Sequence, residues 1–287
     1  MNGDALLALL LRASAALAGA VVLLIAAFLL RESLPAFAQV GLGRLFGDAS
    51  WHPNALAAEG TFNLQPMLWG TLIATAGALL LAAPLGVISA VFMHFYAPPL
   101  LAGVYRRMIE LLAGIPSVVY GLWGLVVLVP LILQLHPPGP SLLAGVLILA
   151  LMILPTIALL CDAALAAVPA ATLRGAAALA MGRWSTVLRV MLPAAKSGIF
   201  TGIILGAGRA LGETMAILMV CGNIVQLPHS IFDPIRTLTA NIALEMAYAL
   251  GDHRAALFAS GLLLLALVVV LTAATEALSQ KKLVPHA

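Results

Sequence analysis

Charged side chains are scarce in this sequence. Only 9% of its 287 residues are Asp, Glu, Lys or Arg, whereas a soluble globular domain carries about 25%. Apolar residues make up 63% of the chain, and the mean hydropathy is +1.12. The apolar runs are long and rich in Leu, Ala and Val, unlike the alternating segments of roughly ten residues that build membrane barrels. The composition therefore excludes a soluble domain and predicts an all-α integral membrane protein.

Patterns that carry catalytic or cofactor chemistry are also missing. Cys161 and Cys221 form neither a CxxC pair nor a disulfide framework. The six histidines show no metal-ligand spacing, and no nucleophile stands with a matching base. No G-x-x-x-x-G-K-[ST] loop is present, so ATP-driven work would need a partner subunit. We expect a non-enzyme without a cofactor of its own, and the net charge of +3 is too small to indicate a nucleic-acid partner.

Charged segments and Pro/Gly breaks predict six transmembrane helices. They are expected at about 13–30, 67–96, 109–133, 141–161, 197–226 and 255–277. The first run is longer than the 7–15 apolar residues of a signal peptide. We therefore expect an uncleaved span, although Ala36-Phe37-Ala38 resembles a cleavage site.

The spans suggest three parts. Residues 1–66 would form one transmembrane helix and an external segment, residues 67–278 a five-helix core, and residues 279–287 a cytoplasmic tail. Orientation follows from Lys and Arg, which favour cytoplasmic loops. Nine lie on one side, namely Arg12, Arg106, Arg107, Arg174, Arg183, Arg189, Lys196, Lys281 and Lys282, and four on the other, namely Arg31, Arg44, Arg236 and Arg254. Both termini and the 162–196 segment are therefore expected in the cytoplasm.

The 162–196 segment is unlike a flexible linker. Residues 170–181 are rich in alanine, the best helix former, and Gly182 and Pro193 mark two breaks. We expect a short helix, a turn, and an amphipathic helix that leads into the fifth span. The small residues would let another protein approach closely, but Trp184 and the arginines equally suit a helix lying on the membrane. Composition leaves both alternatives open.

Two charged residues lie inside the fifth apolar run, GIILGAGRALGETMAILMVCGN. Arg209 is 13 residues beyond Lys196, or about 20 Å along a helix, within a hydrocarbon core of about 30 Å. A charge at that depth costs about 2.5–3.5 kcal/mol or more, so it should not face lipid. The spacing of four predicts that Arg209 and Glu213 share one helix face. Gly202 and Gly206 fall on that face, where they either admit a neighbouring helix or leave room for a solute.

Two roles fit this face. The planar fork of Arg209 suits the oxygens of a passing oxyanion. Glu213 would then hold Arg209 when the anion is absent, or accept a hydrogen bond from a protonated oxygen of the anion. Alternatively, the Arg–Glu pair locks two subunits together.

Three stretches resemble ABC-importer permeases. Leu192-Pro193 is similar to the end of the EAA loop, which in that family forms the coupling helix that docks on the ATPase subunit. IPSVVYGLWGL (115–125) and GRALGETMAILMVCGN (208–223) resemble the phosphate-specific transport (Pst) permease of the C type. Together with the order of the spans, the resemblance covers about residues 67–278. Residues 162–196 are therefore named the coupling loop.

The resemblance implies a type I ABC-importer permease fold with six transmembrane helices. It implies a subunit that transports inorganic phosphate through the cell inner membrane, beside a sister A-type permease, two ATP-binding ATPase subunits and an external phosphate-binding protein. The implied substrate path contains Arg209, Glu213 and Thr214, with Gly202 and Gly206. The implied coupling residues are Arg174, Ala176, Ala178, Ala180, Gly182, Leu192 and Pro193.

The coupling loop departs from the family pattern. Counted back from Leu192-Pro193, the motif glutamate falls on Arg174 and the motif glycine on Ala180. We expect Gly182, two residues later, to supply the turn instead.

Other functions remain as alternatives. The sister A-type permease usually continues Gly-Glu-Thr with Ala-Pro, whereas this chain has GETMAILMV, which favours the C type. A permease for another oxyanion would need the same features. A self-contained carrier would use Arg209 and Glu213 as a proton relay, but the inverted repeats expected of such a carrier are not visible. An intramembrane enzyme would need a nucleophile and base, which the sequence does not offer.

Overall fold

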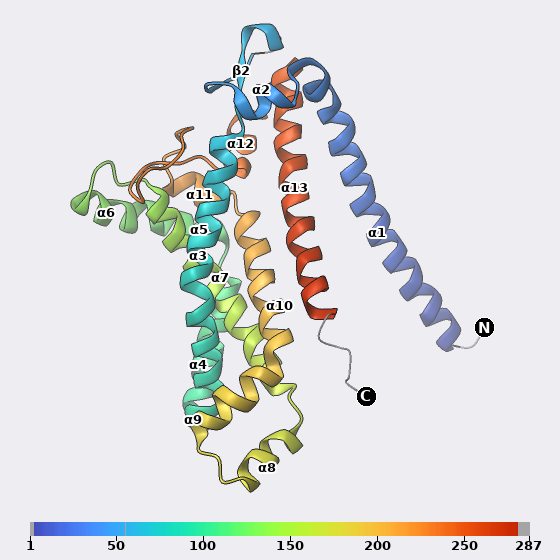
Figure 1. Ribbon diagram of the computed structural model, residues 1–287, viewed down its shortest axis with the longest axis vertical. Helices are drawn as coiled ribbons and strands as arrows, with labels where there is room; N and C mark the ends of the chain where they lie inside the picture. Colours follow the sequence, from blue (N-terminus) through green and yellow to red (C-terminus); the bar gives the residue numbers. More distant parts are fainter. Residues whose placement is uncertain (1–2, 55, 281–287) are drawn as a thin grey trace. The chain divides into compact units, whose positions relative to one another are not determined.

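The computed structural model describes residues 3–54 and 56–280, so Lys281 and Lys282 of the expected tail lie outside the described residues. The described chain consists of helices, connecting loops and a two-stranded antiparallel hairpin (Figure 1). The elements up to Trp123 are α1 (Gly3–Pro35), η1 (Ala36–Val40), α2 (Leu42–Gly47), β1 (Trp51–His52), η2 (Ala57–Glu59), β2 (Thr61–Phe62), α3 (Gln65–Val91), η3 (Phe92–Tyr96), α4 (Pro99–Gly114) and α5 (Ser117–Trp123). The elements from Gly124 onward are η4 (Gly124–Leu128), α6 (Val129–Leu135), α7 (Leu142–Ala166), α8 (Ala170–Ala178), α9 (Arg183–Thr186), η5 (Val187–Met191), α10 (Leu192–Leu211), α11 (Met215–Val220), α12 (Leu238–Glu245) and α13 (Gly251–Gln280).

Six helices in the described residues are long and apolar enough to cross a membrane, as predicted. They are Leu6–Val40, Gln65–Tyr96, Ser117–Leu135, Leu142–Ala166, Arg183–Leu211 and Gly251–Ala273. The fifth ends at Leu211 and not near residue 226, which changes the geometry expected around Glu213.

The predicted third span is divided by Pro116. The helix α4 starts at Pro99, between the predicted second and third spans, since proline suits the first turn of a helix. It ends at Gly114, because proline disfavours helical backbone in the residue before it, and Ile115 is extended at φ −67° and ψ 128°. The chain resumes a helix at Ser117, so Pro116 ends one helix rather than kinking a continuous one.

The chain forms two compact units. One contains Met1–Gln65 and Ile242–Ala266, and the other contains Pro66–Asn241 and Leu267–Ala287. The boundary at Gln65 lies beside the division expected at residue 66. Residues 242–266, expected in the five-helix core, instead cluster with the N-terminal segment.

A buried polar network organises the first unit. The Trp51 indole nitrogen donates to Glu245 Oε2 at 2.9 Å, and His253 Nε2 lies 2.9 Å from the same oxygen. Asp252 Oδ2 accepts the backbone N–H of Ala57 at 2.8 Å. These contacts anchor the hairpin segment on α12 and α13, because a buried carboxylate is stable only when its oxygens have partners.

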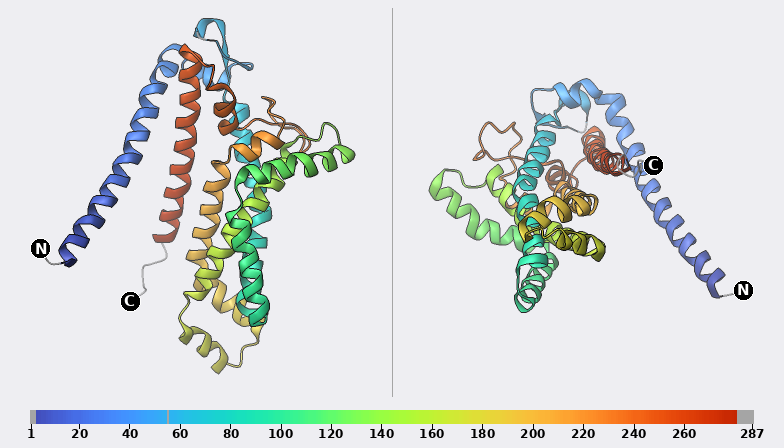
Figure 2. Two further views of the ribbon diagram at one scale, coloured as in Figure 1. Left: turned by 180° about the vertical axis from the view of Figure 1, so that it is seen from behind. Right: turned by 60° about the horizontal axis from the view of Figure 1, so that its bottom comes forward.

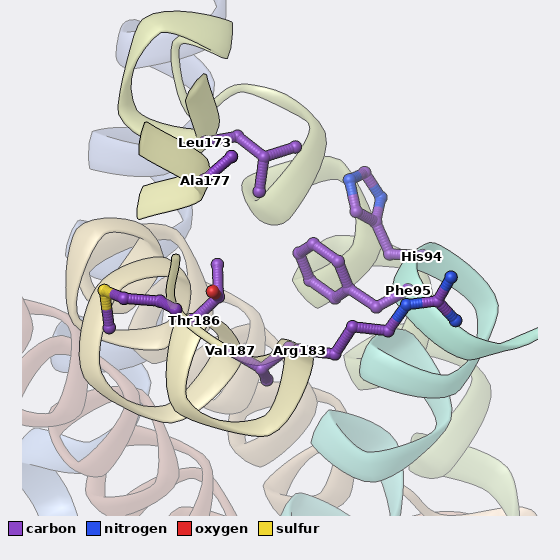
Figure 3. Close-up of a pocket in the computed structure, with 8 residues that line it drawn as sticks. His94, Phe95, Leu173, Ala177, Arg183, Thr186 and Val187 are labelled. Atoms are coloured by element: carbon purple, nitrogen blue, oxygen red, sulfur yellow. The ribbon is translucent and has the colours of Figure 1, made fainter. Parts of the chain in front are cut away.

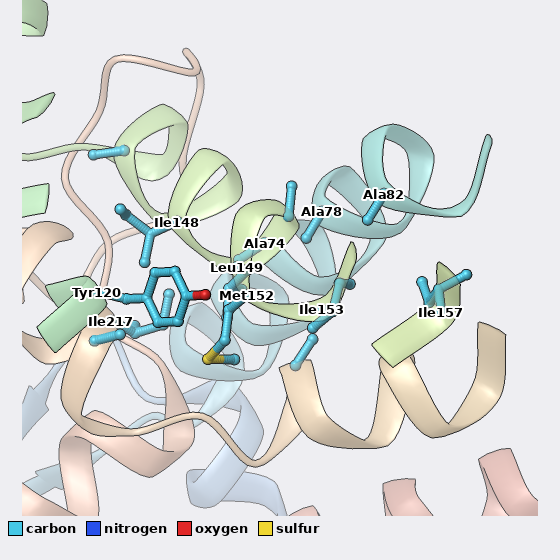
Figure 4. Packing of buried hydrophobic residues seen from close by; sticks show 14 of the residues in the cluster. Ala74, Ala78, Ala82, Tyr120, Ile148, Leu149, Met152, Ile153, Ile157 and Ile217 are labelled. Atoms are coloured by element: carbon cyan, nitrogen blue, oxygen red, sulfur yellow. The ribbon is translucent and has the colours of Figure 1, made fainter. Parts of the chain in front are cut away.

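The core of the second unit is built around α7. Its buried side chains include Ile148, Leu149, Met152, Ile153 and Ile157 (Figure 4). Ala74, Ala78 and Ala82 recur every four residues on α3 and are almost fully buried in the same core. Such small residues let two helices approach closely.

The helix α10 lies beside α7 (Figure 2), and glycines of α10 form a stripe along this contact. A Cβ atom added to Gly198 would lie 2.5 Å from Ala164 Cβ, and one added to Gly202 would lie 3.0 Å from Leu160 Cβ. At Gly206 the added atom would lie 2.9 Å from Ile157 Cγ1. Of the two explanations for these glycines, the structure shows the close approach of a neighbouring helix.

Candidate functional site

Arg209 lies in the last turn of α10, on the face that carries the glycine stripe. Its Nη1 donates a hydrogen bond of 3.0 Å to Thr156 Oγ1 on α7. The side chain is half-buried. A cation is favoured at this end of the helix by the partial negative charge of the last carbonyl groups. The expectation that Arg209 faces protein is therefore confirmed.

Glu213 does not share a helix face with Arg209, so that prediction is wrong. The helix ends at Leu211 with Gly212 as its C-cap, and Glu213 lies in the break before α11. Its Oε1 accepts the backbone N–H of Ala216 at 3.0 Å. Glu213 thus caps α11, where a carboxylate satisfies an unpaired N–H group. Within the described residues, no ion pair joins Arg209 to Glu213.

The remaining candidates for the substrate path lie on either side of this break. Gly202 and Gly206 are buried against α7 and do not border open space in this chain. Thr214 is half-buried at the start of α11, and its hydroxyl donates to the Gly212 carbonyl at 3.3 Å. That these residues line a substrate path stays a prediction.

Two threonines that sequence reasoning missed complete the surroundings. Thr156 holds Arg209, and Thr239 Oγ1 donates to the Glu213 carbonyl at 2.8 Å. The sequence contains a weak sign of Thr156, because its hydroxyl side chain stands inside the otherwise apolar run of α7. The sequence contains no sign of the role of Thr239, because its hydrogen bond joins residues 26 positions apart.

The coupling loop has the predicted arrangement. After the end of α7 it forms the helix α8, a turn, then α9 and η5, and it runs into the start of α10. Ala176 is buried, but much of the surface is exposed and apolar: Leu179 is 77% exposed and Trp184 is 66% exposed. Arg174 and Ala178 are exposed on α8. Leu192 and Pro193 begin α10, with the proline in its first turn.

The turn lies at Ala180 and not at Gly182, contrary to expectation. Ala180 has a left-handed backbone with φ 51°, at the position where the family pattern has glycine. Gly182 is extended, with φ −65° and ψ 156°, and precedes α9 as its N-cap. The loop therefore keeps the backbone turn of the pattern without its glycine. A left-handed residue with a Cβ costs roughly 1–2 kcal/mol.

Replacing Ala180 with glycine should stabilise the turn between α8 and α9 by about 1 kcal/mol, because glycine adopts the left-handed region without strain. Amide hydrogen exchange in residues 170–186 should become slower. The matched change Ala177→Gly, within α8, should destabilise the helix by about 0.5–1 kcal/mol. Faster exchange in Ala180→Gly would contradict the left-handed assignment.

Comparisons with known proteins identify the family. Residues 82–284 match the family described as "Binding-protein-dependent transport system inner membrane component". This chain belongs to that family. It is 36% identical over 246 residues to the phosphate transport system permease protein PstC of Mesorhizobium japonicum, covering 78% of this chain and 74% of that protein. The resemblance to the C-type Pst permeases is thereby confirmed.

A second relative differs in name. The chain is 43% identical over 201 residues to the probable ABC transporter permease protein YqgH of Bacillus subtilis. The match covers 69% of this chain and 64% of that relative, slightly less than two thirds of its length.

Solved structures confirm the fold. A bacterial alginate ABC transporter has a chain with a TM-score of 0.65 at 14% identity, covering 94% of both chains. An inward-facing methionine ABC transporter has one with a TM-score of 0.62 at 18% identity, covering 75% of this chain. The chain is thus a multi-pass membrane protein with the type I ABC-importer permease fold, and its curated relatives are transport permeases rather than enzymes.

Proposed function

We propose that this chain is the permease subunit of an ATP-driven inorganic phosphate importer and forms the translocation path with a sister permease. The observation that carries the proposal is that no carboxylate of the described residues pairs with the guanidinium of Arg209. A guanidinium has five N–H donors, and within the described residues its one hydrogen bond goes to a neutral hydroxyl. No carboxylate of the described chain neutralises it. A half-buried cation with donors to spare suits an oxyanion better than it suits a structural lock.

The relatives support phosphate as the substrate. Two of them, from Mesorhizobium japonicum and Pasteurella multocida, are named phosphate transport system permease protein PstC, and each is 36% identical to this chain. An A-type permease and a permease for another oxyanion are the alternatives. A self-contained carrier loses support, because the Arg209–Glu213 relay it would use is absent from the described chain.

The partners follow from the same assignment. No phosphate-cradling ATP loop occurs in the sequence, so ATP would be bound and hydrolysed on two separate ATPase subunits. The exposed Leu179 and Trp184 support docking at the coupling loop, since exposed apolar patches mark interaction sites. The sister permease of the A type and an external phosphate-binding protein would complete the importer.

Phosphate uptake by a reconstituted complex tests the function. Co-expression with the candidate partners should give a complex whose ATP-dependent uptake of labelled phosphate exceeds that of sulfate or molybdate at least tenfold. Uptake of another oxyanion at the higher rate would replace phosphate as the substrate. Uptake by the chain alone would point to the carrier.

We also propose that both termini and the coupling loop face the cytoplasm of a cell whose inner membrane holds the protein. The basic residues favour this orientation. A membrane-impermeant thiol reagent should label Ala58→Cys, which is exposed in η2, in intact cells. Ala178→Cys on α8 should react only after permeabilisation. The reverse pattern would invert the topology.

A further inference from the structure

A buried carboxylate lies at the end of α7 that leads into the coupling loop. The Asp162 side chain is only 3% exposed. Its Oδ2 lies 2.5 Å from Arg106 Nη2 on α4, and its Oδ1 lies 3.4 Å from His94 Nδ1 on η3. One acid thus joins three segments of the chain. It is the only acidic residue between positions 162 and 196.

This arrangement is costly for a purely structural contact. Removing a charge from water costs several kcal/mol, and apolar residues of similar size often stabilise a fold as well or better. Asp162 Oδ1 is buried without a hydrogen bond, so the carboxylate is not fully satisfied. A directional contact of this kind fixes the register of packed helices in some proteins.

The helix that carries Asp162 also carries Thr156. Six residues, or about 9 Å of helix, separate Asp162 from the threonine that holds Arg209. In the other direction, α7 ends at Ala166, four residues later, and the rest of the coupling loop follows. The glycine stripe of α10 packs on the same helix. The coupling loop is therefore connected to Arg209 in two ways, along α10 itself and through α7 and its Thr156.

The coupling loop itself is not closely packed against η3. A pocket of about 270 Å³ separates His94 and Phe95 from Leu173 and Ala177 of α8 and from Arg183 of α9 (Figure 3). His94 thus borders Asp162 and also lines this pocket. This space therefore lies between α8 and η3, whereas Asp162 holds α7 to α4 and η3.

We propose that Asp162 is a positioning residue for coupled transport. Held by Arg106 and His94, it fixes α7, so that a displacement of the coupling loop reaches the Thr156–Arg209 contact through α7. This inference rests on the proposed function, because it requires an ATPase to move the loop.

The test compares Asp162→Asn with the wild type in the purified complex. Asparagine is nearly isosteric, and the side chain of Arg106 is 47% exposed and can be hydrated when its partner is lost. The complex should therefore assemble and hydrolyse ATP. The phosphate taken up per ATP hydrolysed should fall at least fivefold. Arg106→Lys, which keeps the charge, should retain more of this ratio, and Arg107→Gln, at an exposed neighbour, should leave it unchanged.

Further variants separate positioning from stability. Arg106→Gln strands a buried carboxylate and should reduce the amount of assembled complex. The double variant Arg106→Gln with Asp162→Asn should recover assembly without recovering the ratio. A normal ratio in every assembled variant would overturn the inference.

A reporter independent of the substrate completes the test. Met215 is 44% exposed and begins α11, just after the break that follows α10. When Met215→Cys is the only change, ATP should alter the rate at which its thiol is labelled. Asp162→Asn should abolish that change, and an unaltered change would contradict the inference. The labelling result does not depend on the substrate. If the wild-type complex took up no phosphate, the proposed function would fail, but the labelling experiment would still test the role of Asp162.

Discussion

Replacement of Arg209 by glutamine should abolish phosphate uptake while the assembled complex persists. Glutamine keeps much of the volume and can still donate to Thr156 Oγ1, which accepts from Arg209 at 3.0 Å, but it removes the positive charge that would offset the anion. Lysine keeps the charge and loses the planar fork, so Arg209→Lys should transport weakly. Labelled-phosphate uptake, normalised to assembled complex, measures both. We expect a loss of more than a hundredfold for glutamine and about tenfold for lysine.

Changes at the neighbours of Arg209 provide the controls. Thr156→Val removes the hydrogen bond but leaves the charge, so uptake should fall only a few fold. Glu213→Gln should impair uptake less than Arg209→Gln, because it weakens the cap of α11, worth about 0.5–2 kcal/mol, and leaves the cation in place. The double change of Arg209 and Glu213 to glutamine should stay inactive. Uptake near the wild-type level in that double variant would show that the charge of Arg209 does not serve the anion.

The contact of Arg209 with a neighbouring helix was predictable from the residue type. The cost of a lipid-facing charge predicted that Arg209 would not face lipid, and its guanidinium donates to Thr156 on α7. Its depth in a membrane stays a prediction. The predicted helix face was wrong for Glu213, since the prediction assumed one helix through Gly212, where the chain leaves α10. Helix periodicity describes a face only as far as the helix continues.

The coupling loop shows a similar limit. Alanine content and two breaks predicted a helix, a turn and a second helix, which the structure has. The turn was expected at Gly182, because glycine adopts the left-handed region most easily. It lies at Ala180, an alanine with φ 51°. Residue type alone gives no signal for a left-handed alanine.

Contacts between distant segments could not be predicted from the pattern. Asp162 lies 56 positions from Arg106 and 68 from His94, and neither spacing belongs to a helix period. Of the three, only Arg106 entered the sequence analysis by number, as one of the basic residues that set the orientation. Tertiary packing brings them together at the end of α7.

A bulky or charged residue on the exposed surface of the coupling loop should abolish transport by preventing ATPase docking. Ala178 is exposed at the end of α8, and a Cβ atom added to Gly182 would have no neighbour within 4 Å. Both Ala178→Trp and Gly182→Asp should therefore leave the fold of this chain intact. Uptake and ATPase stimulation should each fall at least tenfold, and the ATPase should no longer co-purify.

The matched control for docking is Ala58→Trp, the same change at an exposed alanine outside the coupling loop. It should leave ATPase co-purification unchanged. The membrane-inserted permease pair should remain in all three variants, because none of the changes adds a buried clash. If the loop were instead an interfacial helix held by Trp184 and the neighbouring arginines, Gly182→Asp would weaken membrane contact but leave ATPase binding intact. Co-purified ATPase at the wild-type level in both coupling-loop variants would exclude docking at this surface.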